Sequence, residues 1–317
     1  MSSGLPASAS PLDPASAASA ASAAPASSGV TGASGASEPA AVAPPLGRAV
    51  GVWGPAAALA RREAVRFFRQ RSRVTGALLT PVVFWLLLGS GLNHNFVLQP
   101  GAQDASATQY MAYFFPGTIV MIVLFTAIFS TFSVIEDRHA GFMQAVLASP
   151  APRLSIVLGK VVGCAGIAAA QATLFLLAWP FVAKLSVLDA GLWLRMLGCV
   201  PLMFILGAGL ASLGLTLAWR IDSTAGFHAV MNLLLMPMWF LSGAVFPLPP
   251  AGPVRYLMLL NPLTYGQAAF TSWLTARPGA TMLPFPDPLA GAIALACAAA
   301  ATLWAVRTVS RVPTQHP

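Results

Sequence analysis

One short internal segment carries the densest set of groups in this chain that could form ion pairs or bind a charged partner. It runs Ile135-Glu136-Asp137-Arg138-His139, and Gly141 follows closely. An apolar stretch from 142 to 147 comes next at helical spacing. This pattern predicts a short surface helix with an apolar face for a soluble partner, although a simple solvated loop would have a similar sequence. The candidate docking residues are Glu136, Asp137, Arg138, Gly141, Phe142 and Pro150.

Motifs for other chemistry are missing from the sequence. The pair Gly159-Lys160 lacks the upstream glycine and the following hydroxyl of a phosphate-binding loop. Cys164, Cys199 and Cys297 are scattered within apolar runs and have no metal-ligand spacing. No Ser/His/Asp set or H-E-x-x-H pair is present. The sequence therefore predicts a protein that is not an enzyme and holds no cofactor of its own.

The composition places the chain in a membrane. Of 317 residues, 57% are hydrophobic and only 8% are charged, and the mean hydropathy is +0.74. A soluble domain is about 25% charged, so this chain has too few charges to cover a water-facing surface. The net charge of +8 would suggest nucleic acid in a soluble protein. In this chain the placement of the basic residues favours an effect on membrane orientation, and no nucleic-acid partner is expected.

The expected fold is an all-α membrane domain over residues 74–312. Six uncharged stretches approach the ~20 residues needed to cross a bilayer. They are roughly 74–92, 115–135, 161–183, 196–219, 223–247 and 288–306. A seventh stretch is interrupted by Asn261-Pro262, and proline removes a backbone donor and disfavours helix before it. We therefore expect 248–275 to be an extracellular re-entrant element, with Tyr265 just after the break.

Two different segments precede the first expected span. Residues 1–50 are rich in Ala, Ser, Pro and Gly, which predicts a disordered tail, and no signal peptide is evident. Residues 51–73 form an amphipathic pattern that predicts an interfacial elbow helix at the lipid headgroups. An ordinary positive flank of the next helix is the alternative. The basic stripe of the predicted elbow consists of Arg62, Arg66, Arg69 and Arg73.

The basic residues also indicate the orientation. With six spans and a cytoplasmic N-terminus, thirteen of the 17 Lys and Arg residues fall on the cytoplasmic side. The positive-inside bias predicts this asymmetry, with both termini cytoplasmic.

Polar residues are sparse within the expected spans. Gln171 and Asn232 could line a pathway or bond to a neighbouring helix, and His228 lies near a span end. No ionisable residue lies in the middle of a span, which disfavours an ion-driven carrier.

The chain resembles ABC-2 type exporter permeases, and most nearly the NodJ and daunorubicin-resistance branch. The match includes Asp137, Arg138, Gly141, Phe142, Leu147 and Pro150 in the family's coupling segment, with Gly159-Lys160 after them. It also includes Phe115-Pro116-Gly117, the stretches 84–91 and 231–249, and Asn261-Pro262-Leu263-Thr264-Tyr265. Asp137 stands where glutamate is usual, and His139 where a second acid is usual. These departures argue against a specific ion pair with a partner, but they leave the expected placement of the helix unchanged.

The resemblance implies a bacterial inner-membrane permease in a homodimer or a heterodimer with a sister permease. It implies a separate ABC ATPase subunit that carries ATP and magnesium, and export of an amphipathic drug-like molecule, lipid or lipo-oligosaccharide. The segment from 137 to 149 would be the cytoplasmic coupling helix. A structural or assembly membrane protein and an ion-gradient-driven carrier are the competing hypotheses.

Overall fold

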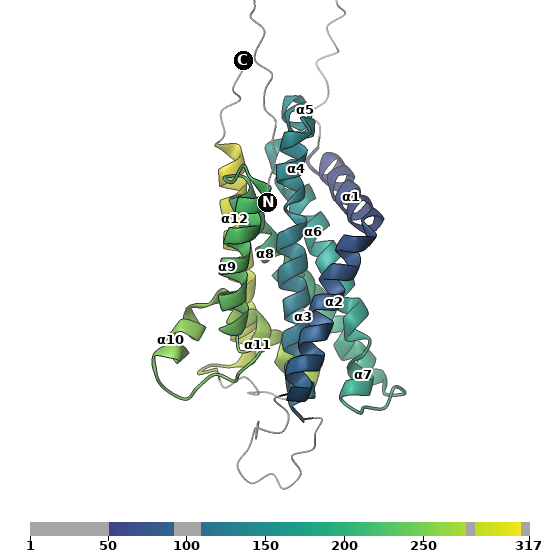
Figure 1. The fold of residues 1–317 in the computed structure, drawn as a ribbon, viewed down its shortest axis with the longest axis vertical. Coiled ribbons are helices and arrows are strands. Elements are labelled where there is room, and N and C mark those ends of the chain that lie inside the picture. Colours follow the sequence, from purple (N-terminus) through teal and green to yellow (C-terminus); the bar gives the residue numbers. More distant parts are fainter. Residues whose placement is uncertain (1–50, 92–108, 277–282, 312–317) are drawn as a thin grey trace, which may run out of the picture. The chain divides into compact units, whose positions relative to one another are not determined.

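The computed structural model describes residues 51–91, 109–276 and 283–311. The chain divides into two units, Met1–Gly47 and Arg48–Pro317. The first unit, and with it nearly all of the predicted tail 1–50, lies outside the described residues. Everything described in the second unit is helical or connecting chain, as the sequence predicts (Figure 1).

In chain order, the helices of the described residues are α1 (Trp53–Arg69), α2 (Arg71–Gly91), α3 (Gln109–Ser130), α4 (Ser133–His139), α5 (Phe142–Ala148), α6 (Arg153–Leu176), α7 (Trp179–Val182), α8 (Ala190–Ala218), α9 (Thr224–Phe240), α10 (Pro253–Leu260), α11 (Pro262–Thr275) and α12 (Asp287–Ser310).

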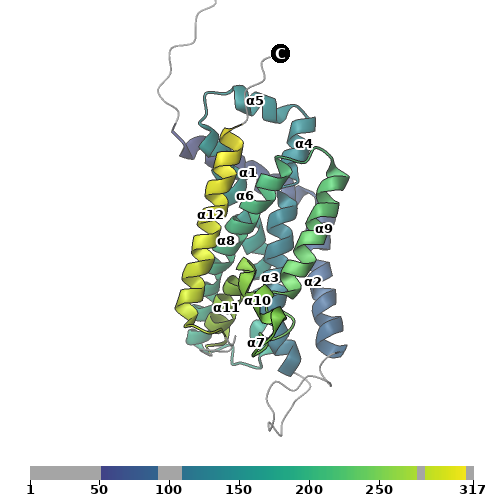
Figure 2. The ribbon, with the colours of Figure 1, turned by 90° about the vertical axis from the view of Figure 1, so that its left-hand side faces the viewer.

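Helix α3 lies in the middle of the bundle, against α2, α6, α8 and α9 (Figures 1 and 2). Its apolar residues surround the whole helix, and Phe114, Ile119 and Val123 are fully buried. A helix that is apolar on every side suits such an enclosed position. Helix α9 instead packs through one stripe, Phe227, Met231, Leu235 and Trp239, and most of its remaining surface is exposed.

Among the residues that the structure describes, five helical stretches are long and apolar enough to cross a membrane. They are Val74–Gly91, Tyr110–His139, Arg153–Val182, Ala190–Ala218 and Asp287–Ser310. The predicted stretch 223–247 contains the shorter α9, which has 17 residues and ends at Phe240. A turn follows in which Gly243 has a φ of 84°, so the predicted limit at 247 is wrong.

Other predicted limits also shift. The predicted span 115–135 covers most of α3 and the beginning of α4, with a break at Thr131 and Phe132. The predicted span 161–183 covers most of α6 and all of α7, and it crosses the break between the two helices. The spans are predicted from uncharged stretches, whereas α6 begins at Arg153 and so includes charged residues before its apolar part.

The predicted elbow 51–73 is two helical segments rather than one. Helix α1 ends at Arg69 and α2 begins at Arg71, so Arg73 belongs to α2. Helix α1 packs along α6, where Gly159 and Gly163 leave room for it. A Cβ atom at Gly159 would lie only 2.7 Å from the Cβ of Leu59 and 2.8 Å from the carbonyl oxygen of Ala56. Ala56, Leu59 and Phe67 of α1 are therefore buried against protein, whereas Val65 and Phe68 of the same helix stay exposed.

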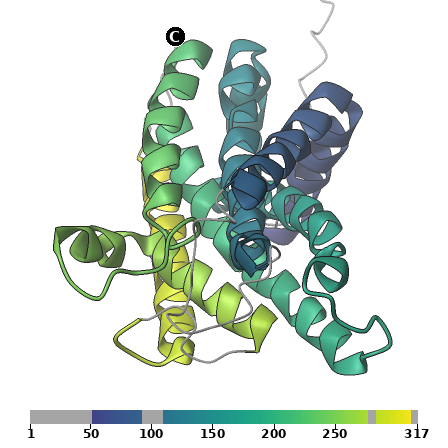
Figure 3. The same ribbon diagram turned by 60° about the horizontal axis from the view of Figure 1, so that its bottom comes forward.

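The stretch 248–275 contains two helices that meet at Asn261. The Asn261 side chain accepts a hydrogen bond from the Leu263 amide at 3.0 Å and so caps α11, with Pro262 in the first turn. Its Nδ2 donates to the Met238 carbonyl at 2.6 Å, and Tyr265 donates to the Leu259 carbonyl. In the view with the lower end forward, α10 projects to one side and the α6–α7 corner to another (Figure 3).

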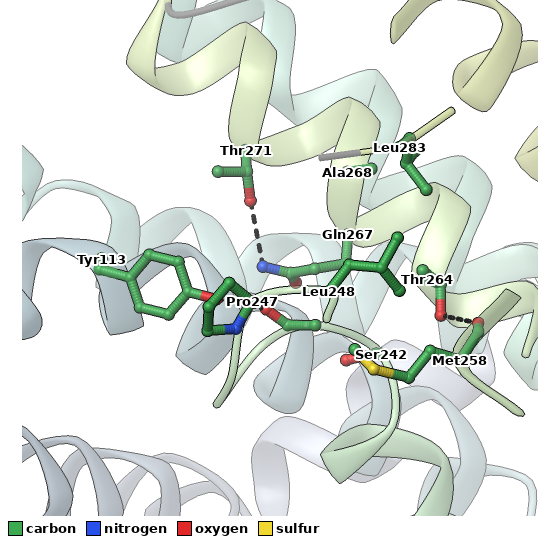
Figure 4. A pocket seen from close by; sticks show the side chains of 11 residues that line it. Tyr113, Ser242, Pro247, Leu248, Met258, Thr264, Gln267, Ala268, Thr271 and Leu283 are labelled. Carbon is green, nitrogen blue, oxygen red and sulfur yellow. Dashed lines mark hydrogen bonds between the residues drawn. The ribbon is translucent and has the colours of Figure 1, made fainter. Parts of the chain in front are cut away.

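A small cavity of about 30 Å³ lies between α3, the turn after α9 and α11 (Figure 4). Gln267 points into it and donates to Thr271 at 3.0 Å, whereas its Oε1 atom is buried without a hydrogen-bond partner among the described residues. The cavity has room for a water molecule, which would supply the donor that this oxygen needs.

The α1–α6 contact leads to a stability prediction. Gly159→Ala should lower the thermal unfolding midpoint of the purified protein in detergent, because overpacking costs about 1–3 kcal/mol. The matched control is Gly166→Ala on the same helix, where a Cβ meets nothing within 4 Å. That control should unfold at the same temperature or slightly higher, since alanine favours helix by about 1 kcal/mol. Equal stability of the two variants would contradict the close packing.

Candidate functional site

The site is the corner between α4 and α5, at the end of the bundle where α1 begins and α12 ends (Figures 1 and 2). Gly141 makes this corner possible because it adopts a left-handed φ of 73° between the two helices. Of the predicted docking residues, Phe142 begins α5 and Pro150 follows it in exposed chain.

Asp137 is the centre of a buried ion-pair cluster. Its side chain is 2% exposed, and it accepts hydrogen bonds from Lys160 Nζ at 2.6 Å and from Arg66 at 2.8 Å. Arg62 binds it through two nitrogens, at 2.7 and 3.0 Å. This fork-shaped contact uses both carboxylate oxygens, a geometry that guanidinium groups favour.

Lys160 occupies the deepest part of the same cluster. It is 1% exposed and donates to Glu63 at 2.5 Å and to the Ser133 hydroxyl at 3.1 Å. The cluster therefore joins α1, α4 and α6 through charged groups. Its six charged members are Arg62, Glu63, Arg66, Glu136, Asp137 and Lys160. Among the described residues of the cluster, three positive and three negative charges balance, and pairing of this kind offsets the cost of burying Asp137, Glu63 and Lys160.

The rim of the cluster is partly exposed. Arg66 forms an ion pair with Glu136 at 2.7 Å, and the Arg62 guanidinium also lies 3.8 Å from the centre of the Phe142 ring. The hydrogen bond to Asp137 raises the pKa of Arg62 above its ordinary value. Arg62 and Arg66, expected at the lipid headgroups, thus bind carboxylates of the protein. Arg69 remains exposed on α1.

Arg138 anchors the corner to a different helix. It donates to the carbonyl oxygens of Ala218 at 2.9 Å, Trp219 at 3.2 Å and Ile221 at 2.5 Å, where α8 ends. The last carbonyls of a helix lack intrahelical donors and carry partial negative charge, so a guanidinium stabilises this end. A further contact to Asp222 at 3.2 Å is exposed to solvent.

The exposed surface of the corner is therefore the outer side of α5. Met143 points into the protein, while Gln144, Ala145 and Ala148 are exposed. Asp137, expected to contact a partner, is enclosed by its own chain. The sequence analysis did not select Glu63, Lys160 or Ser133 for the site. Glu63 could have been found from the sequence, because it is an acidic residue beside Arg62 and lies one helical turn before Arg66 and Phe67.

The polar residues of the predicted pathway occupy different environments. Gln171 is buried, accepts a hydrogen bond from Thr126 at 2.7 Å and donates to the Val74 carbonyl at 3.3 Å. Its amide is thus used between α6, α3 and α2. Asn232 instead lies on the exposed side of α9. Among the described residues, no three His, Cys, Asp or Glu side chains form a group suited to a metal ion.

The buried cluster predicts a large effect for the loss of one partner. Lys160→Met should lower the free energy of unfolding by about 3–5 kcal/mol, because it leaves Glu63 and Asp137 with less compensation. Denaturation of the detergent-solubilised protein measures this change. Arg69→Met, at the exposed α1 position, should stay within about 0.5 kcal/mol.

A double variant separates charge from packing. Glu63→Gln combined with Lys160→Met should recover part of the stability lost in Lys160→Met, since one carboxylate charge is removed with the cation. Additive losses in the double variant would contradict direct coupling of these two residues.

Comparison with known proteins agrees with this architecture. Nodulation protein J of Rhizobium leguminosarum bv. viciae is 31% identical over 176 residues, which cover 55% of this chain and 63% of that protein. The putative transport permease ycf38 of Cyanophora paradoxa is 24% identical over 210 residues, or 65% of this chain and 69% of that protein. The profile of the ABC-2 type transporter family matches residues 56–274, which include most of α1, the α4–α5 corner and α6. The chain therefore belongs to the ABC-2 type transporter family.

Proposed function

We propose that this protein is the membrane-spanning permease subunit of an ABC exporter, driven by a separate ATPase that docks on α5. The observation that supports this most directly is the fastening of the α4–α5 corner to three other helices. A surface helix tied to the bundle in this way can transmit motion, whereas a free loop cannot. Since the sequence contains no phosphate-binding loop, ATP and magnesium would bind to the partner subunit.

Two connections would carry motion from α5 into the membrane domain. Asp137 connects the corner to α1 through Arg62 and to α6 through Lys160. Arg138 connects it to the end of α8. Movement of the corner would therefore displace all three helices. Each nucleotide state of the ATPase must then favour one arrangement of these helices, because a ligand shifts an equilibrium only through differential binding.

The proposed topology has six crossings, with α9 as the fifth. At about 1.5 Å per residue, 17 residues span about 26 Å, slightly less than the ~30 Å hydrocarbon core. Helices α10 and α11 would then form the re-entrant element on the outer side. An even number of crossings agrees with the start of α1 and the end of α12 at the same end of the bundle (Figure 1). That end would be cytoplasmic in a bacterial inner membrane.

The exposed side of α9 supports pairing with a second permease. Asn232 places an amide there, and an amide facing hydrocarbon lacks hydrogen-bond partners. A second copy, or a sister permease, would supply contacts for it. The amphipathic substrate would pass between the two permeases and leave near α10 and α11. A drug-like molecule, a lipid and a lipo-oligosaccharide all fit this description.

Substitution on the exposed face of α5 tests the docking surface. Ala145→Trp should reduce by at least about tenfold the ABC ATPase that co-purifies with the tagged chain from its own host, since a bulky group at a docking centre opens the contact. Quantitative mass spectrometry measures the ratio of the two subunits. The control Ser310→Trp changes an exposed residue at the same end of the bundle and should leave the ratio unchanged. Equal ratios for both variants would contradict docking on α5.

Substitution of Arg138 tests the transmission step. Arg138→Ala should leave the complex assembled while ATP hydrolysis continues without export, because the end of α8 loses its connection to α4. Arg138→Lys, which keeps the charge but offers fewer directed donors, should give intermediate export. Normal export by Arg138→Ala would refute this role. Export that survives ATP depletion would instead favour an ion-driven carrier, and a complex without an ATPase would favour a structural protein.

A further inference from the structure

An apolar hollow of about 290 Å³ lies on the face formed by α8 and α12. In Figure 2, α12 and α9 stand in front, and α8 lies behind α12. Leu210 and Leu213 of α8 and Ala301 and Trp304 of α12 line the hollow, and Met238 of α9 adds to it. Pro262, where α11 begins, also borders it.

The size and lining of the hollow suit a hydrocarbon chain. An engineered apolar cavity of about 150 Å³ is large enough for benzene, and this hollow is about twice that volume. Much of the lining consists of small residues. Two of them, Gly209 and Ala298, allow α8 and α12 to approach so closely that a Cβ atom added to Gly209 would lie 3.0 Å from Ala298. The lining offers no charged group and no amide or hydroxyl side chain to a polar ligand. In a bilayer, the group that fits this apolar hollow is the acyl chain of a lipid.

Arginine residues continue both helix faces beyond the hollow, toward the α5 end. Arg307 lies on α12, and Arg311 caps its end; they come three and seven residues after Trp304, which places them about one and two turns further along the same side. Arg220 follows the end of α8, where its backbone amide donates to the Leu217 carbonyl at 3.0 Å. Leu217 lies one turn beyond Leu213, which lines the hollow. Positive charge therefore stands at the end of each of the two helices that line the hollow, where Arg220, Arg307 and Arg311 are exposed.

These arginines differ from those of the buried cluster in their partners. Arg62, Arg66 and Arg138 all contact carboxylates. Within the described part of the chain, no carboxylate lies within ion-pair distance of Arg220, Arg307 or Arg311. Arg153 adds further positive charge, because it donates to the Ser310 carbonyl at the end of α12 at 2.8 Å.

We infer that this face binds an anionic phospholipid of the membrane, with an acyl chain in the hollow and the phosphate at Arg220, Arg307 and Arg311. Guanidinium groups bind phosphate oxygens in pairs, and basic residues beside transmembrane helices attract anionic headgroups. The apolar hollow alone would accept the chain of any lipid. The arginines make the site selective for a negative headgroup, so charge complementarity determines the occupant. This inference requires only that the chain spans a membrane, and it is independent of the proposed export function.

Native mass spectrometry of the purified full-length protein tests the inference. Phosphatidylglycerol and phosphatidylcholine with identical acyl chains serve as probes, and phosphatidylglycerol should bind more tightly. Each of Arg220→Gln, Arg307→Gln and Arg311→Gln should reduce the preference about fivefold, as expected for one basic residue near an anionic headgroup. The matched control Arg69→Gln removes an exposed charge of α1 and should keep the preference.

Filling the hollow provides a second, independent measurement. Ala301→Leu should weaken binding of both lipids while leaving the preference for phosphatidylglycerol intact. Equal affinity of the unmodified protein for the two lipids would overturn the inference, as would the same loss of preference in Arg69→Gln. Displacement of phosphatidylglycerol by inorganic phosphate would overturn it in favour of a simple anion site. Dimers that hold no lipid and are disrupted by Ala301→Leu would overturn it by showing that a second copy covers this face.

Discussion

Lys160 is buried and therefore requires carboxylate partners, and this requirement determines how the helices are arranged at the α5 end of the bundle. A buried ammonium ion is costly unless it is paired and hydrogen-bonded. Its two carboxylates come from α1 and from α4, which both pack near this part of α6. The same requirement that neutralises one lysine thus fixes the position of the first helix and of the helix that leads to α5. Arg62 and Arg66 then complete the balance around Asp137.

This charge cluster and the close glycine contacts act together. Gly163 allows the backbone of α1 near Ala60 and Glu63 to approach α6, where a Cβ would lie 3.1 Å from each of these residues. The approach brings Glu63 within reach of Lys160, one turn away on the same side of α6. Packing and electrostatics therefore specify the same position for α1.

The connection between structure and proposed function follows from this rigidity. Because α4 is fastened at Asp137 to α1 and α6 and at Arg138 to the end of α8, a movement of α5 that displaces α4 would also displace these helices. Helix α9 contrasts with this, since it packs through a single stripe and leaves Asn232 exposed. One part of the domain is thus well connected, and another leaves a helix face exposed. Under the proposed function, the first would transmit movement of the ATPase and the second would meet another permease.

The sequence by itself determined the membrane class, the helical fold and the approximate positions of the apolar stretches, because these follow from composition and local patterning. It also indicated the short helix after Gly141 and the break at Asn261-Pro262, since apolar spacing and proline both act on the nearby backbone. Only the tertiary structure decided that Asp137 turns inward, that Glu63 and Lys160 join it, and that Gln171 bonds between helices. These are contacts between residues far apart in the chain, such as the 97 positions that separate Glu63 from Lys160. Local pattern shows which side chains need partners, but only the packing of the helices selects them.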